Sequence, residues 1–207
     1  MKVAIINYSM GNLSSVRRSF EEIGADAVIA NHPSTLYEVD RIVLPGVGAF
    51  AEGMAHLNQG GWVSALNEVV NLQHKPLLGI CLGMQMLASK GDEGGETEGL
   101  GLISGEIQKI DSLGCELRIP HMGWNEVKYK AEDAIFASIP ESSDFYFVHS
   151  FAFVPTHTES LIATVDYGCE LSAVVRNKHV FGCQFHPEKS SKAGRQLLKN
   201  FMSYSPC

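Results

Sequence analysis

Short apolar runs alternate in the first half of the chain with segments in which apolar residues recur every three or four positions. Such runs are typical of strands that are buried on both faces of a sheet. They are Lys2–Asn7, Ala27–Ala30, Arg41–Leu44 and Pro76–Ile80. Helical spacing lies between them, in Leu13 to Ile23, Phe50–Leu57 and Trp62–Leu72. This alternation predicts an α/β fold, with an open, mostly parallel sheet and helices on both faces.

The second half is richer in short strand-like runs that turn residues separate at short intervals. The pattern predicts a more antiparallel C-terminal half, packed as a second layer or as an extension of the sheet. The expected strands are Glu106–Ile110, Asn125–Tyr129, Phe145–Val148, Leu161–Val165, Ser172–Arg176 and Val180–Phe185, and a final helix is expected over Ser191–Ser203. No internal repeat or linker divides the sequence, so we expect a single domain over residues 1–207.

Charge and hydropathy narrow the possible partners. Lys and Arg total 16 and Asp and Glu total 23, a net charge of −7, which argues against nucleic acid because a surface that follows phosphates needs clustered cations. The longest apolar stretch, Pro76–Ala88, falls short of the roughly 20 residues that span a bilayer. The N-terminus lacks the apolar core of a signal peptide. These features predict a cytoplasmic protein without a membrane partner.

The five cysteines and eight histidines form no recognisable framework. The cysteine count is odd, CxxC is absent and nothing indicates secretion, so we expect unpaired thiols and no disulfide framework. No HxxxH pair or Cys/His cluster suggests a metal site.

One cysteine lies in an unusual sequence, Gly79-Ile80-Cys81-Leu82-Gly83. It follows an apolar strand and precedes a helical run, the arrangement of a nucleophile elbow with cysteine in place of serine. The sharp turn leaves no room for a Cβ at the two glycines. A helix that begins at the nucleophile favours the thiolate through its amide dipoles. By itself, the pattern is equally consistent with a small buried cysteine.

A base for this nucleophile is available at His186, which follows an apolar strand and precedes Pro187. A residue before proline favours an extended backbone, so Glu188 is expected on the same side of the chain, where it orients the imidazole. Gly46 and Gly48 follow another strand, and their backbone amides, with that of Leu82, can form an oxyanion hole. All three segments end predicted strands, at the edge where open α/β sheets bind ligands.

Three of these segments, PGVGAF, GICLGMQ and QFHPEKS, together resemble the class I glutamine amidotransferases, which have a flavodoxin-like fold and a Cys-His-Glu triad. Within that family, MGNLSSV, PHMGWNEV and YFVHSF are similar to the glutaminase subunits of imidazole glycerol phosphate synthases. The resemblance implies that Cys81 attacks the side-chain amide of glutamine, with His186 as base and Glu188 as its support. A glutamyl thioester forms and is hydrolysed to glutamate and ammonia. No cofactor or metal is implied.

The resemblance also assigns substrate and partner contacts. The residues that match substrate-binding positions are Phe50, Gln85, Glu93, His149, Ser150 and Phe151. The implied partner is a (β/α)8-barrel cyclase, which forms a heterodimer with this chain and uses the ammonia in histidine biosynthesis. The residues that match interface positions are Asn12, Met122, Trp124, Asn125, Tyr146 and Lys189. From their residue types alone, Met122 and Trp124 would be assigned to the core.

Three other hypotheses remain open. The family often has Asp-Tyr-Gly where this chain has Asn7-Tyr8-Ser9, which leaves room for a paralogue that feeds ammonia to another synthase, for example in amidination of surface sugars. A cysteine peptidase on a related fold uses the same elbow but usually has its histidine soon after the cysteine. A non-catalytic regulatory subunit is disfavoured by the intact triad.

Overall fold

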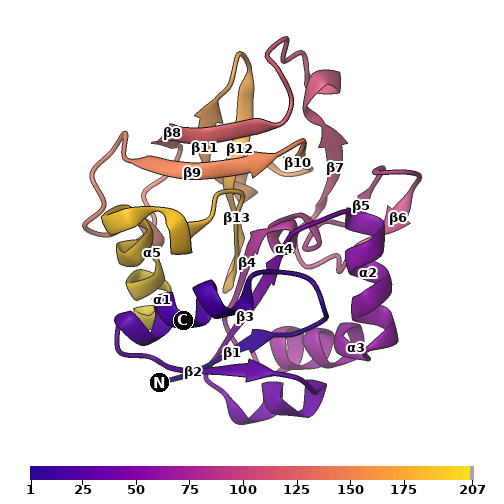
Figure 1. Cartoon of the computed structure of the whole chain (residues 1–207), viewed down its shortest axis with the longest axis vertical. Helices are drawn as coiled ribbons and strands as arrows, with labels where there is room; N and C mark the ends of the chain where they lie inside the picture. The colour runs from indigo at the N-terminus through magenta and orange to yellow at the C-terminus, as the bar shows by residue number, and fades with distance from the viewer. Residues whose placement is uncertain (206–207) are drawn as a thin grey trace.

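The computed structural model describes residues 1–205 and confirms the α/β fold class. A nine-stranded sheet crosses the molecule in the order β2-β1-β3-β4-β13-β12-β11-β8-β9 (Figure 1). Its strands are β1 (Lys2–Ile6), β2 (Asp26–Ala30), β3 (Arg41–Gly46), β4 (Leu77–Cys81), β8 (His121–Tyr129), β9 (Asp144–His149), β11 (Leu161–Asp166), β12 (Glu170–Asn177) and β13 (Val180–Cys183).

The sheet changes character at β13. The strands from β2 to β13 pair in parallel, whereas those from β13 to β9 pair antiparallel. The antiparallel C-terminal half therefore extends the parallel sheet, one of the two arrangements that its turn spacing predicted. β13 itself returns to the centre, parallel to β4, because its residues are apolar on both faces.

A second sheet, in the order β10-β7-β5-β6, lies beside the first. Its strands are β5 (Lys90–Gly91), β6 (Thr97–Glu98), β7 (Gly105–Lys109) and β10 (Phe151–Pro155). The sequence pattern predicted β7 but missed β10, which only Ser150 separates from β9. A short strand that ends in proline has little alternation to reveal it.

Helices cover both faces of the large sheet, as predicted. α1 (Leu13–Glu22) contacts α5 (Ser191–Ser203) over one face, and α2 (Phe50–Gln59) contacts α3 (Trp62–Asn67) over the other (Figure 1). Each face has its own apolar core, one built around Phe20 and Phe201, the other around Phe50 and Trp62. Shorter helical elements are η1 (Pro33–Glu38), η2 (Glu68–Leu72), α4 (Leu82–Gln85), η3 (Ile110–Leu113), η4 (Ala134–Phe136), η5 (Thr158–Ser160) and η6 (Pro187–Lys189).

The expectation of unpaired thiols is wrong for two cysteines. Cys115 and Cys169 form a disulfide, with Cα atoms 5.1 Å apart. Their 54-residue separation hides this contact in the sequence, and it arises because the loop before β8 packs on the β11–β12 turn. There Tyr167 Oη also donates a hydrogen bond to Arg118 O at 2.7 Å. Cys81 and Cys183 are free and buried, and Cys207 lies outside the described residues.

Across residues 1–205, none of the helices combines the length and the apolar character that crossing a membrane requires. The same residues contain no group of three or more His, Cys, Asp or Glu side chains placed to hold a metal ion.

Candidate active site

The parallel arrangement of three strands brings the predicted chemistry to one edge of the sheet. Gly46, the last residue of β3, pairs with Cys81, the last residue of β4. β13 lies on the other side of β4, and its last residue, Cys183, pairs with Ile80. The chain therefore leaves β13 beside the cysteine and reaches His186 three residues later.

Cys81 lies in a strained turn. Its φ of +54° falls in the left-handed region that L-residues rarely adopt. A Cβ at Gly79 would come within 2.6 Å of Gly83 O, and a Cβ at Gly83 would collide with Leu44 O. The two glycines are thus required by close backbone contacts, as the sequence predicted.

The helix that follows Cys81 is shorter than predicted. α4 comprises only Leu82–Gln85, after which the chain continues in tighter turns to Ala88. One helical turn aligns few amides, so the dipole expected to favour a thiolate is small.

His186 and Glu188 form a buried pair. His186 Nδ1 lies 2.8 Å from Glu188 Oε1, and both side chains are under 5% exposed. Glu188 reaches the ring because Pro187–Lys189 forms a 3-10 turn, not the extended segment that was expected. The backbone of His186 is also held: its N–H donates to Tyr146 O at 2.9 Å, and its carbonyl accepts from Ser190 Oγ at 2.6 Å.

The electrostatics of His186 favour its protonated form. Burial lowers the pKa of the imidazole, but the adjacent Cys81 and the Glu188 carboxylate outweigh burial and raise the pKa to about 9. Within residues 1–205, His186 Nε2 and Glu188 Oε2 are two of only three buried side-chain polar atoms that lack a hydrogen-bond partner. Nε2 therefore has no hydrogen-bond acceptor that would hold its proton, and His186 and Cys81 line the same pocket.

A pocket of about 400 Å³ opens at this edge of the sheet. It brings together nine predicted site residues, Gly48, Cys81, Leu82, Gln85, Glu93, His149, Ser150, Phe151 and His186, with Val47, Pro120 and Val148. Gly46 and Glu188 are not lining residues, but each adjoins one: Gly46 pairs with Cys81, and Glu188 contacts His186. Phe50 does not line the pocket: its side chain is fully buried, and only its backbone N–H approaches the site, by donating to Glu93 Oε2 at 2.7 Å.

One residue near the sulfur was not predicted. Gln184 is fully buried, and its Nε2 lies 3.7 Å from Cys81 Sγ. A signal was available, because residues two apart in an extended segment project to the same side, and Gln184 is two residues before His186.

A pair of histidines belongs to the pocket wall, where His149 lines the pocket and His121 does not. His121 and His149 are cross-strand partners in β8 and β9, and His121 Nδ1 lies 2.9 Å from His149 Nε2. His149 Nδ1 lies 2.8 Å from Phe151 O, which can only accept, so His149 donates there and accepts a hydrogen bond from His121. Burial lowers the pKa of His121 to about 4 and that of His149 to about 3.

This pair predicts an acid-sensitive stability. Below the ordinary histidine pKa of roughly 6.5, both histidines become protonated in the unfolded chain but stay neutral in the folded protein, because their pKa values there are lower. The free energy of unfolding should therefore fall as pH falls from about 6.5 toward 4, by on the order of 5 kcal/mol for the two histidines together. Urea titrations across this range measure the loss. The loss should be smaller in His121→Asn and unchanged in His157→Gln, an exposed control. An equal loss in His121→Asn would contradict the assignment.

Four of the six residues predicted to face a partner, Met122, Trp124, Tyr146 and Lys189, lie together beside the site, and all but Tyr146 are exposed. Trp124 pairs with Tyr146 across β8 and β9, their rings 6.0 Å apart, and Lys189 Nζ lies 5.7 Å from the Tyr146 ring. Met122 and Trp124 are 60% and 52% exposed, so the alternative that their residue types suggested, a place in the core, is excluded.

The two asparagines predicted at the interface have internal roles. Asn12 caps α1 by accepting from Ser15 N at 3.3 Å. Asn125 donates to Asp166 O at 2.8 Å, on the β11–β12 side.

The segment that departs from the family pattern keeps a tight turn. Asn7 Oδ1 accepts a hydrogen bond from Ser9 N at 3.2 Å, and Ser9 adopts a φ of +73°. Ser9 therefore holds the left-handed conformation that glycine usually provides.

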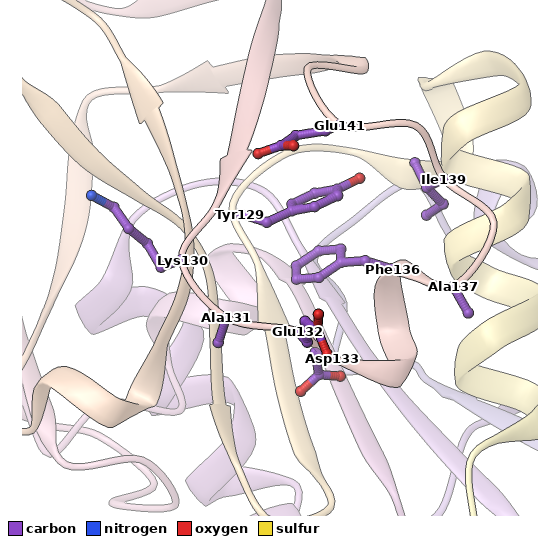
Figure 2. Close-up of a pocket in the computed structure, with 9 residues that line it drawn as sticks. All are labelled: Tyr129, Lys130, Ala131, Glu132, Asp133, Phe136, Ala137, Ile139 and Glu141. Atoms are coloured by element: carbon purple, nitrogen blue, oxygen red, sulfur yellow. The ribbon is translucent and has the colours of Figure 1, made fainter.

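Figure 2 shows a second surface depression, of about 500 Å³, and Cys81 is not among its lining residues. The depression is lined by Tyr129, Lys130, Ala131, Glu132, Asp133, Phe136, Ala137, Ile139 and Glu141. Tyr129 stacks on Phe136, and burial with the nearby Glu141 raises the pKa of the Tyr129 phenol to about 12. None of its lining residues is a cysteine or histidine, so this depression lacks the nucleophile and base of the Cys81 pocket.

Known proteins with similar sequences belong to a family whose chemistry agrees with this site. The family model "Glutamine amidotransferase class-I" matches residues 4–204. The chain is 47% identical to imidazole glycerol phosphate synthase subunit HisH 1 of Campylobacter jejuni. This match runs over 200 residues and covers 97% of this chain and 98% of the relative. It is 44% identical to subunit HisH of Moorella thermoacetica, over 96% of this chain and 93% of the relative.

Solved structures share the fold at lower sequence identity. PurLQS from Thermotoga maritima has a TM-score of 0.76 at 19% identity, over 98% of both chains. A glutamine amidotransferase from the same organism has a TM-score of 0.68 at 18% identity, over 98% of this chain and 83% of the other. The sequence matches decide the family: this chain belongs to the class I glutamine amidotransferases.

Proposed function

We propose that the chain is the glutaminase subunit of an imidazole glycerol phosphate synthase. One observation carries the proposal. A buried Cys81, His186 and Glu188 meet at a single pocket, in a chain that is 44–47% identical over nearly its full length to subunits of that name. The chain hydrolyses glutamine to glutamate and passes the ammonia to a cyclase subunit.

The reaction begins at the Cys81 thiolate. The sulfur attacks the side-chain amide carbon of glutamine, and a C–S bond forms while the carbonyl oxygen takes up negative charge. Gly48 and Leu82, which line the pocket, and Gly46 behind it form the site for this oxyanion. His186 carries the proton at Nε2 and gives it to the amide nitrogen as ammonia departs. His186 then takes a proton from water, which hydrolyses the thioester to glutamate.

The pocket offers matching groups for the amino-acid end of the substrate. Both Nε2 hydrogens of Gln85 are used, toward Phe151 O and Gln184 Oε1 at 3.1 Å each. Its Oε1 therefore remains to accept a hydrogen bond from the substrate's ammonium group, next to the Glu93 carboxylate. The backbone of Ser150 and Phe151 binds the substrate carboxylate.

The partner is a (β/α)8-barrel cyclase that binds over Met122, Trp124, Tyr146 and Lys189 as a heterodimer. The exposure of two large apolar side chains beside the active-site mouth supports this choice, because such residues mark interaction surfaces. The contact of His186 N with Tyr146 O gives this face a direct connection to the base.

Replacement of Trp124 by alanine tests the partner surface. Loss of a central aromatic anchor should weaken cyclase binding by about 2 kcal/mol, some 30-fold. Titration of the cyclase against glutamate release measures the change, and unstimulated turnover should stay within a few-fold. Leu72→Ala is the matched control, because Leu72 is 75% exposed and ends η2, before the N-terminal end of β4. The active site lies at the C-terminal end of the same strand. Equal effects of the two variants would contradict the interface.

The function itself is tested by glutamate release with and without a histidine-pathway cyclase and its nucleotide ligand. We expect strong stimulation by the liganded cyclase. Absence of stimulation, combined with labelling of Cys81 by a glutamine analogue, would leave a glutaminase that serves a different synthase.

A further inference from the structure

Gln184 joins the nucleophile to the substrate pocket through a fixed amide. The residue is fully buried, and Nε2 donates a hydrogen bond to Cys81 Sγ at 3.7 Å. It is thus one of the few polar groups that contact the reacting sulfur. Among residues 1–205, the sulfur has one other hydrogen-bond partner, Val148 O, which accepts from Cys81 Sγ at 3.8 Å, and His186 lines the same pocket.

The orientation of this amide is determined by its neighbour. Gln184 Oε1 accepts a hydrogen bond from Gln85 Nε2 at 3.1 Å. Because a glutamine amide has its donor and acceptor on opposite sides, the Nε2 group must then face the sulfur. Gln85 Nε2 also donates to Phe151 O at 3.1 Å, so the same network holds the pocket wall.

A donor at this position changes the balance between thiol and thiolate. Hydrogen bonds to a charged acceptor are stronger than those to a neutral one, so an N–H that faces the sulfur favours the thiolate. The single turn of α4 contributes little to that end. Gln184 is neutral and therefore stabilises the charge without pairing with it as a cation would.

We infer that Gln184 is a positioning residue of the glutaminase reaction, which holds Cys81 as an aligned thiolate and links it to Gln85. The inference rests on the proposed function for the role of Cys81 as nucleophile. The test of the inference does not rest on that function, because the protonation of the Cys81 sulfur can be measured without glutamine or a cyclase.

The experiment measures the pH dependence of Cys81 alkylation by iodoacetamide, followed by mass spectrometry of the peptide that contains Cys81. In Gln184→Met, which keeps the shape and removes the donor, the midpoint should rise by about one pH unit. In Gln184→Glu it should rise further, because a carboxylate then faces the thiolate. Cys183 does not compete, because burial and the nearby Glu188 raise the pKa of its thiol.

Gln196→Met on α5 is the matched control and should leave the midpoint unchanged. In the complex with the cyclase, Gln184→Met should lower kcat roughly tenfold with KM within a few-fold, since the lost contact is with the sulfur. A merely structural role predicts lower thermal stability with an unshifted midpoint, and that result in folded variants would overturn the inference.

The wild-type protein provides a measurement that does not depend on variant folding. The side-chain amide NMR signals of Gln184 should shift with pH along the alkylation curve of Cys81, and the pH dependence should vanish after alkylation. Signals that do not respond would also overturn the inference. A confirmed shift in a protein that releases no glutamate would instead contradict the proposed function alone.

Discussion

Replacement of Cys81 by serine is expected to lower glutamine-dependent turnover by about four orders of magnitude or more. The weaker nucleophile cannot use a base arrangement built for a thiolate, although the side chain is nearly the same size. The complex should still form product when ammonia is supplied directly, because the cyclase site is untouched. The two activities, measured side by side on one preparation, separate chemistry from folding.

Cys183→Ala provides the control for this substitution. Cys183 is the other free thiol among residues 1–205. It is buried at the end of β13, beside β4, and its Sγ donates a hydrogen bond to Gly79 O. Its loss should change turnover by only a few-fold. Loss of ammonia-dependent activity in Cys81→Ser would mean that the substitution damages the fold or the interface.

The largest expected effect on stability is that of Gly83→Ala. The added Cβ would collide with Leu44 O, and neither backbone can move because both belong to the core around β3 and β4. Overpacking against main chain should cost more than about 4 kcal/mol, enough to leave the protein unfolded or insoluble. Chemical denaturation of the purified protein, or the soluble fraction if none can be purified, measures the loss.

Gly94→Ala separates this collision from the general cost of replacing glycine. An added Cβ at Gly94 meets nothing within 4 Å, although its φ of +80° disfavours alanine. That change should cost only about 1 kcal/mol. Similar losses in both variants would show that the turn at Cys81 tolerates a side chain and that close backbone contacts do not require glycine at position 83.

The sequence predicted those parts of the site that depend on local patterns. Cys81 between two glycines, and His186 before Pro187, each follow an apolar run, and the parallel pairing of β4 with β13 brings them together. The parallel order of the first half follows from strand and helix alternation, and α5 has the predicted bounds. The single domain over residues 1–207 and the cytoplasmic location stay predictions.

Features that depend on contacts between distant segments were not predictable. The Cys115–Cys169 disulfide requires the β11–β12 turn to meet a loop that lies 54 residues away. The exposure of Trp124 was implied only by the family resemblance. The residue pattern of β8 does not predict it, because a period-two pattern cannot say which face of a strand with mixed residues is left uncovered. The helix after Cys81 ends after one turn, although Met86 and Leu87 maintain helical spacing. Its residues are buried on all sides, so spacing carries little information there.

The central claim is that Cys81 carries the glutamyl group during turnover. The most direct measurement is an acid quench of the glutaminase–cyclase complex during glutamine hydrolysis, followed by mass spectrometry of the chain and its peptides. We expect a glutamyl adduct on the peptide that contains Cys81, and none in Cys81→Ser. Steady glutamate release with no adduct, or with an adduct on another residue, would contradict the claim.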